Sequence, residues 1–296
     1  MKLQKAGYIL LFVGLSMKLW GLLPVNLVYA QQSNGSSEPI FPSDAKDPDQ
    51  VGGAKLLDAV CPDKVFVSKG VGCQAECPEY TSFPRDGMTW TLDKVTLGHF
   101  LSPTSQDAVL SMDGCEPHSA NFGGTILLTR RSQGWSMLWY KSGVDTLRCH
   151  KVALRDGREI LVCIGEYGGQ GNVWTELYVE DLLSPTPALM AGKAGFFSAY
   201  DNTFTCGQMG DETFPIIRSH IDRVEFISTR RGEVPAVTVT ATFGKKSPTP
   251  DVVKACMAKE HSALPAAKRY RIDFFFDGSE YRPAQSSIDA AGVFEH

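Results

Sequence analysis

The feature that most constrains the fold is a succession of β-type runs, separated by turn residues, that fills the chain from about residue 90 onward. The runs are rich in Val, Ile, Thr and aromatic residues and are bounded by Gly, Asp, Ser or Pro, which is typical of strands. Asp156-Gly157 and Asp277-Gly278 are strong signals for tight hairpin turns. The pattern predicts an all-β domain built from antiparallel hairpins.

The runs fall into three similar units of four strands. Meanders that repeat in this way are typical of propeller blades, so we predict three antiparallel four-stranded meander units in a propeller-like arrangement. A single β-sandwich is the alternative, because its hairpins also follow one another along the chain. The predicted runs are 94–100, 108–112, 125–130 and 135–141, then 147–154, 159–167, 173–179 and 195–200, and finally 221–228, 236–243, 270–276 and 280–284.

One short helix is predicted inside the third unit, at 250–260. Thr249 suits the N-cap position, and Pro250 suits the first helical position because its missing N–H would have no partner there. Val252, Val253 and Cys256 would form the apolar side of this helix.

The first thirty residues have the composition of a signal peptide. Lys2 and Lys5 give a positive start, residues 8–17 form an apolar run, and Ala30 is the small residue expected before a cleavage site. Lys18 interrupts the apolar stretch, so no segment reaches the length of about 18 apolar residues that a membrane span needs. We predict a secreted or periplasmic protein that has no membrane association after cleavage.

Cleavage would change the net charge from −4 to −7, because residues 1–30 hold three lysines and no acid. This balance argues against a nucleic-acid partner, whose recognition needs clustered Lys and Arg. Residues 31–54 are rich in Ser, Pro, Asp and Gln, and they predict a disordered linker. Residues 55–296 would then form a single all-β domain that begins with a cystine-rich cap at 55–89.

Eight cysteines follow the export segment, and in an oxidising compartment they predict disulfides. Cys149 and Cys163 lie symmetrically about the turn at Asp156 and would face each other across two strands. Cys73 and Cys77 each have Cys61 or Cys115 within reach along the chain, and Cys206 and Cys256 remain for each other. Because no second ligand pair follows Cys73 and Cys77 at finger-like spacing, we predict no metal site.

Three polar connections, 113–124, 165–172 and 244–268, link the second and third strands of the three units. Meanders stacked in the same sense would place these loops on one face, and binding residues concentrate on such loops. Within them we select five residues as candidate ligand-binding positions: Glu116, His118, Asn121, Gln170 and Asn172.

No nucleophile elbow, zinc-protease motif, phosphate-binding loop or EF-hand loop is present in the sequence. We therefore predict an exported binding or interaction module that needs no cofactor and uses these loops to bind a protein or a glycan. An exported hydrolase with an acid–base pair of Glu116 and His118 is one alternative, because His can transfer a proton while a carboxylate orients it. A structural envelope protein is the other.

Overall fold

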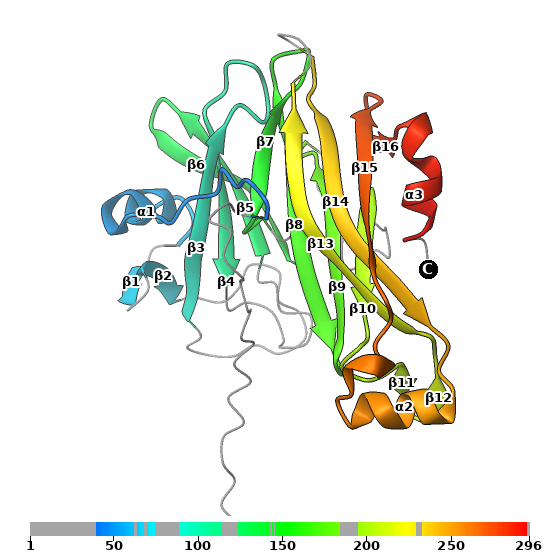
Figure 1. Cartoon of the computed structure of the whole chain (residues 1–296). Helices are drawn as coiled ribbons and strands as arrows, with labels where there is room; N and C mark the ends of the chain where they lie inside the picture. Colours follow the sequence, from blue (N-terminus) through cyan, green and yellow to red (C-terminus); the bar gives the residue numbers. More distant parts are fainter. Residues whose placement is uncertain are drawn as a thin grey trace, which may run out of the picture. The chain divides into compact units, whose positions relative to one another are not determined.

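The computed structural model describes residues 40–61, 64–67, 70–74, 89–113, 124–142, 144, 146–183, 195–228 and 233–294. Most of the strands belong to three antiparallel sheets, and each sheet follows the chain order from strand to strand (Figure 1). The first sheet consists of β1 (Lys64–Val67), β2 (Gly70–Gln74), β3 (Thr89–Gly98), β4 (Asp107–Asp113), β5 (Gly124–Arg131) and β6 (Gly134–Ser142).

The second and third sheets have four strands each. The second consists of β7 (Cys149–Ala153), β8 (Glu159–Gly169), β9 (Asn172–Glu180) and β10 (Phe197–Asp201). The third consists of β13 (Ile216–Ile227), β14 (Ala236–Lys246), β15 (Lys268–Phe276) and β16 (Tyr281–Pro283). The remaining elements are the hairpin of β11 (Gln208–Met209) and β12 (Glu212–Thr213), the α-helices α1 (Gln50–Leu57), α2 (Pro250–Met257) and α3 (Ile288–Gly292), and the 3-10 turns at His261–Ala263 and Gln285–Ser287.

The prediction of three antiparallel meanders is confirmed, because every expected run overlaps a strand in the expected sheet, but the first sheet has six strands instead of the four predicted. The described strands of the first and third sheets do not pair with each other, so no ring closure is observed among them. Sequence patterns did not indicate β1, β2, the hairpin of β11 and β12, or helices α1 and α3.

The second sheet is the middle layer and is buried on both faces. Successive side chains of a strand point to opposite faces of its sheet. In β8, Ile160 and Val162 pack in one cluster with Val237 of the third sheet, whereas Leu161 packs in another cluster with Leu127 of the first sheet. This alternation explains why β8 carries a nearly continuous apolar run over its first half.

The outer faces of the first and third sheets differ in what covers them. On the far face of the first sheet, Leu57 of α1 packs into one cluster with Trp90 and Leu110. The third sheet instead carries polar side chains on its far face, where the hydroxyl of Thr242 donates to Asp222. Clusters of buried apolar residues therefore lie on both faces of the first and second sheets. The main cluster of the third sheet lies on its inner face, which packs against the second sheet.

Residues 40–49, which we name the strap, contact β3, β7 and β13, the first strands of the three predicted units. The carbonyl of Ile40 accepts a hydrogen bond from Val224 of β13, and the amide of Asp44 donates to Cys149 of β7. Lys46 forms a bridge with Val95 of β3. The prediction of a disordered linker up to residue 54 is therefore wrong for 40–54, since strand edges supply backbone partners that a polar segment needs in order to be held in place.

The described disulfides agree with the cysteine analysis. Cys149 and Cys163 face each other directly across β7 and β8 with their Cα atoms 4.1 Å apart, which confirms the favoured pair. The Cys206–Cys256 bond is confirmed as well, and Cys73 is joined to Cys61. Cys77 and Cys115 lie outside the described residues. Three disulfides are typical of a protein from an oxidising compartment.

Helix α2 begins where the sequence predicts. The hydroxyl of Thr249 accepts a hydrogen bond from the amide of Val252, as an N-cap does. The helix ends at Met257 rather than Glu260, because Lys259 adopts a left-handed conformation with φ of 61°. No helix in the described part of the chain is long and apolar enough to cross a membrane.

Candidate functional site

The β7–β8 and β15–β16 turns lie at the end of the sheets opposite to the long connections 202–214 and 247–267. The β7–β8 and β15–β16 turns border a common cleft at one end. At the other end lie the β8–β9 turn at 170–171, the segment 202–214 and the β14–β15 connection at 247–267. We name these three segments together the insertion end. In Figure 1 it is the lower end of the sheets, where β11, β12 and α2 lie close together.

The connection expected at 165–172 is shorter than its glycine-rich sequence suggests. Residues 165–169 continue β8, and only Gln170 and Gly171 form the turn, both with positive φ (52° and 83°). This pair of angles is typical of a tight hairpin turn, for which Gly-rich sequences are suited. Gln170 is exposed at the tip of the turn. A Cβ atom at position 171 would lie 2.4 Å from the ring of Phe204, so the turn and the segment 202–214 are in close contact.

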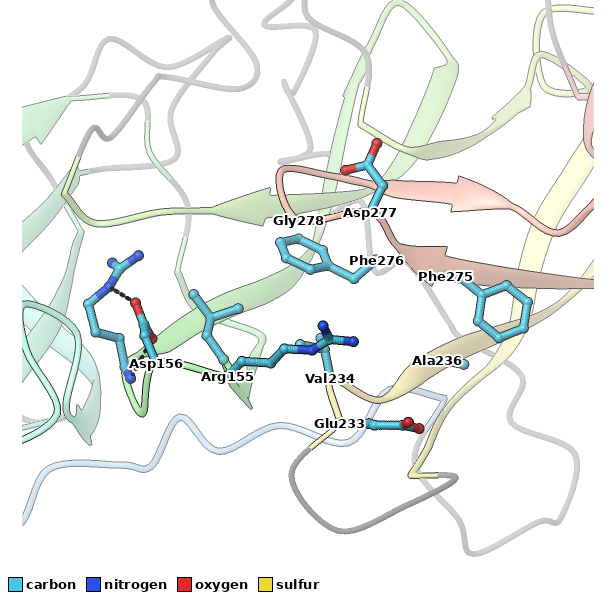
Figure 2. A pocket seen from close by; sticks show the side chains of 11 residues that line it. Arg155, Asp156, Glu233, Val234, Ala236, Phe275, Phe276, Asp277 and Gly278 are labelled. Atoms are coloured by element: carbon cyan, nitrogen blue, oxygen red, sulfur yellow. Dashed lines mark hydrogen bonds and ion pairs between the residues drawn. The ribbon is translucent and has the colours of Figure 1, made fainter.

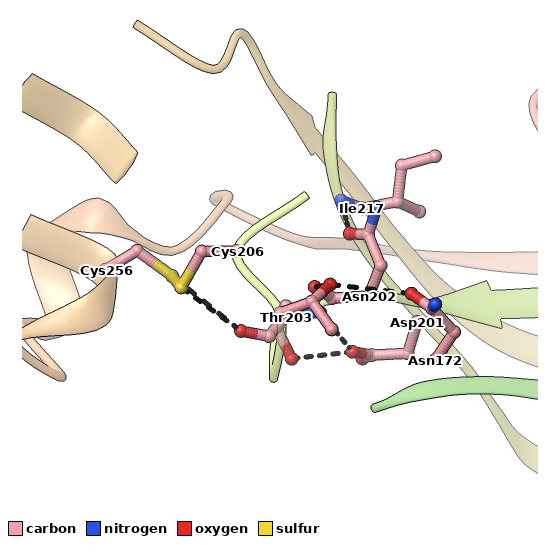
Figure 3. The surroundings of a disulfide bond; sticks show 8 residues. Asn172, Asp201, Asn202, Thr203, Cys206, Ile217 and Cys256 are labelled. Atoms are coloured by element: carbon pink, nitrogen blue, oxygen red, sulfur yellow. Dashed lines mark hydrogen bonds between the residues drawn. A yellow bond between two sulfur atoms is a disulfide. The ribbon is translucent and has the colours of Figure 1, made fainter. Parts of the chain in front are cut away.

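Asn172 is buried, and its side chain holds the turn to the neighbouring segment. Its Oδ1 atom accepts a hydrogen bond from the Tyr200 hydroxyl at 3.0 Å and another from the Thr205 hydroxyl at 3.5 Å. Figure 3 shows Asn172 pointing toward this segment. Asn172 therefore supports the insertion end from within, whereas Gln170 is the member of this predicted pair that faces solvent.

Asn202 fixes the chain where it crosses from the second sheet to the third (Figure 3). Its Oδ1 atom accepts a hydrogen bond from the amide of Ile217 at 2.7 Å, and its Nδ2 donates to the carbonyl of Pro215 at 3.0 Å. Both interactions satisfy backbone groups that would otherwise be costly to bury. The segment that follows Asn202 is thus held at its start and at its end.

The Cys206–Cys256 disulfide joins the same segment to α2 (Figure 3). Both cysteines are buried in a small cluster with Ile216 and Ala263. Two of the three predicted loops, 165–172 and 244–268, are therefore linked through 202–214, which the sequence analysis did not select. Of the remaining predicted loop, 113–124, only the two end residues are described. Glu116, His118 and Asn121 therefore lie outside the described residues.

The insertion end exposes large apolar side chains although its backbone is firmly held. The exposed fractions are 79% for Phe204, 46% for Met209, 40% for Phe214 and 58% for Met257. Sequence patterns did not identify these residues as functional, because a buried and an exposed apolar side chain look alike in a sequence. The nearest available signal was Gly210 in the middle of the 208–213 hairpin, which is typical of a turn.

Comparisons of the chain with models of known protein families, with curated proteins and with solved structures find no match. What the site can do is therefore inferred from its own geometry. The described residues include no group of three or more His, Cys, Asp or Glu side chains that is placed to hold a metal ion.

A row of three aromatic side chains crosses the second sheet beside the insertion end. The rings of Tyr167 and Trp174 are stacked with centroids 5.5 Å apart, and Tyr200 lies 4.6 Å from Trp174 on its other side. The Tyr167 hydroxyl donates to the buried carboxyl of Glu176, and burial raises the pKa of both groups. Because Trp174 is covered by its two neighbours, this row does not offer the indole face that a sugar ring would stack on.

A cleft of about 560 Å³ lies at the opposite end, between the β7–β8 and β15–β16 turns (Figure 2). Asp156 at its rim is engaged with Arg158, and Asp277 accepts hydrogen bonds from the backbone of Ser279 and Glu280. These hydrogen bonds lower the pKa of both carboxyls, to about 2 for Asp277. The two rim carboxylates thus stabilise the turns, and we do not select this cleft as the functional site.

Proposed function

We propose that this protein is an exported binding module that contacts a protein partner through the insertion end. The observation that carries the proposal is the exposure of Phe204, Met209, Phe214 and Met257 on segments held by a disulfide and by buried hydrogen bonds. Exposed apolar residues that gather in one region mark interaction sites more often than chance exposure does. Phe and Met are also among the residues enriched in the buried centre of protein interfaces.

The disulfide and the buried hydrogen bonds that hold these segments in place favour binding of a protein partner. A binding surface that is already ordered loses little conformational freedom when it meets its partner. The network around Asn202 and the Cys206–Cys256 bond supply that order here. Exposed Gln170 in the neighbouring turn belongs to the same end and would supply polar contacts at the rim of such an interface.

The compartment follows from two features that agree. The three disulfides are typical of an oxidising environment. The predicted signal peptide at 1–30 would deliver the chain to such an environment, and secretion or periplasmic location follows as part of the proposal. A partner would then be another exported or surface protein.

We also propose that the three meanders are propeller-like repeats whose first predicted strands all face the strap. The strap contacts β3, β7 and β13, which are the first strands of the three predicted units. First strands on one side and stacked sheet faces are the arrangement of neighbouring propeller blades. The second and third units have the connection between their second and third strands at the insertion end, as repeats of one plan would.

The proposal is tested by comparing two double variants as bait for partner capture from the exported-protein fraction of the source cells. In the first variant, Phe204→Ser and Met257→Ser remove two of the exposed side chains of the insertion end. In the matched control, Ile227→Ser and Ile288→Ser remove two exposed apolar side chains elsewhere, with exposed fractions of 38% and 44%. Captured proteins are quantified by mass spectrometry, and self-association is measured by light scattering.

We expect a protein that the native chain and the control retain and that the insertion-end variant loses by about tenfold or more, because hot-spot side chains carry most of an interface's binding energy. The melting temperatures of the two double variants should agree, since none of the four replaced residues is buried. Capture of the same proteins in the same amounts by both variants would contradict the proposal.

A further inference from the structure

The outer face of the first sheet carries a groove beside the strap and α1. Two adjoining cavities of about 460 Å³ and 330 Å³ form it, and Leu97, Trp135 and Lys151 line both of them. Each volume lies in the range of small-molecule sites, which is about 300 to 1,000 Å³. Because the cavities share three lining residues, a ligand built of several linked units can occupy both. None of the lining residues comes from the insertion end.

The groove is nearly neutral in charge. Its described lining holds five carboxylates and four Lys or Arg side chains. A ligand with many charges of one sign therefore meets no surplus of the opposite sign, and electrostatic complementarity favours a neutral ligand. The carboxylates belong to Asp44, Asp47, Asp49, Asp107 and Glu159, and the cations are Lys46, Lys55, Arg130 and Lys151.

The smaller cavity offers both hydrogen-bond donors and acceptors. The Glu159 carboxylate lies 3.6 Å from the Lys151 ammonium group and accepts a hydrogen bond from the His99 amide at 2.7 Å, so contacts within the protein hold it in place. Gln106 and Arg130 line the same cavity, and both are exposed. Because a sugar hydroxyl both donates and accepts hydrogen bonds, it suits a lining of this mixed kind.

Apolar surface is present where the two cavities meet. Trp135 lines both cavities and is only half-buried against the cluster beneath α1, and Leu97 has 56% of its surface exposed. A sugar ring has an apolar face of C–H groups, for which a partly exposed aromatic ring is a suitable partner. Trp135 thus differs from Trp174, which lies between the rings of Tyr167 and Tyr200.

We propose that this groove binds a neutral glycan, with one sugar ring against Trp135 and hydroxyl groups bonded to the polar lining of the smaller cavity. Two other occupants fit less well. A purely apolar ligand would bury Arg130 and Glu159 without giving either a hydrogen bond, which is costly. A peptide that adds to a sheet needs a free strand edge. The edge of β3 that borders the groove is occupied, because Lys46 pairs with Val95 there.

Titration calorimetry with the mature chain tests the proposal. The probes are short oligosaccharides of glucose, of mannose and of N-acetylglucosamine, and oligogalacturonate is the acidic comparison. We expect at least one neutral oligosaccharide to bind, with a dissociation constant that changes by less than about twofold between low and high salt, because screening acts on charges and this ligand has none. Binding of oligogalacturonate alone, or of none of the probes, overturns the proposal.

Two adjacent arginines of β5 provide a matched pair of variants. Arg130 lines the groove, whereas Arg131, the next residue along the strand, is not among the lining residues, and both are exposed. Arg130→Ala should weaken binding of the neutral oligosaccharide by about tenfold, because a hydrogen bond from a charged donor is lost. Arg131→Ala makes the same change in net charge and should bind like the native chain. Equal weakening in both variants overturns the proposal.

A third variant, Trp135→Leu, keeps an apolar side chain in the groove and removes the aromatic ring. We expect binding to weaken by about tenfold at every salt concentration. Phe275→Leu removes a ring of the third sheet that is 54% exposed, and it should bind like the native chain. The circular dichroism melts of both variants must match that of the native chain; if Trp135→Leu fails this check, the arginine pair decides alone. Unchanged binding by a folded Trp135→Leu variant overturns the proposal.

Discussion

The second sheet and the insertion end are each tied by one disulfide, but in very different surroundings. Cys149 and Cys163 lie within paired strands and in a cluster that packs against the first sheet. Cys206 and Cys256 lie in a cluster of four buried residues, and the side chain of Met257 next to them is exposed. The first bond thus reinforces a region that packing already orders, whereas the second orders a region where packing is sparse.

The same kind of covalent bond therefore has a different role in each of the two regions. Strand pairing and two buried faces hold β7 and β8 together whether or not their cysteines are joined. At the insertion end, the disulfide closes a much longer stretch of chain, with a sequence separation of 50 residues against 14 in the second sheet. Longer closed loops remove more freedom from the unfolded chain. Order at the insertion end should therefore depend on its disulfide more strongly.

The largest expected effect comes from removing packing in the middle layer. Leu161→Ala empties a site that is fully buried between the first and second sheets, and it should lower the free energy of unfolding by about 3 to 5 kcal/mol. Urea denaturation measures the change. Phe204→Ala at the insertion end is the control and should change stability by less than about 0.5 kcal/mol, because that side chain is 79% exposed. A loss at Leu161 no larger than the loss at Phe204 would contradict the assignment of the second sheet as the packed middle layer.

The next effect distinguishes the two disulfides directly. Cys206→Ala with Cys256→Ala should cost about 2 to 4 kcal/mol, and amide hydrogen exchange should accelerate in 202–214 and α2 before it does so in the sheets. Cys149→Ala with Cys163→Ala should leave the exchange of β8 slow relative to that of the insertion end. The comparison fails if both double variants loosen the same segments, as mass spectrometry of the exchanged peptides would reveal.

The smallest expected effect is a pH dependence at Glu176 in the second sheet. Burial raises the pKa of this carboxyl above its ordinary value of 4.5, so the folded state holds a proton that the unfolded chain has already released. Stability from this group is present below about pH 4 and is lost as pH rises through the raised pKa. Glu176→Gln cannot ionise and keeps an acceptor for the Tyr167 hydroxyl, so its advantage over the native chain should grow with pH from 4.5 upward.

Chemical denaturation at several pH values measures this difference. Glu212→Gln, at an exposed position of the hairpin formed by β11 and β12, gives the background for removing a surface charge. An advantage of Glu176→Gln that shrinks as pH rises would show that the folded state favours the ionised carboxylate instead.

Much of the fold could be predicted because its signals are local. Alternating apolar residues, Asp-Gly turns and the symmetry of Cys149 and Cys163 about Asp156 each act within about a dozen residues. Thr249 and Pro250 identified the start of α2 by the same kind of short-range chemistry. The strap was missed because its contacts with strand edges join residues that lie more than 40 positions apart in the chain, as in the pair of Lys46 and Val95.

The candidate sites were less predictable for the same reason. Asn172 was selected as a polar residue, but its side chain is buried and holds a segment that the sequence analysis did not select. Phe204 could not be distinguished from a core residue, since exposure depends on which segments pack over it.

The amino-acid sequence by itself determined the β character, the three meanders, the predicted export segment and two of the three described disulfides, because strand periodicity and turn chemistry act over short distances. Only the tertiary structure decided which sheet forms the middle layer and which apolar side chains remain exposed at the insertion end. Those properties arise when distant segments meet, and they differ between the second sheet and the insertion end because packing covers the former and leaves the latter open.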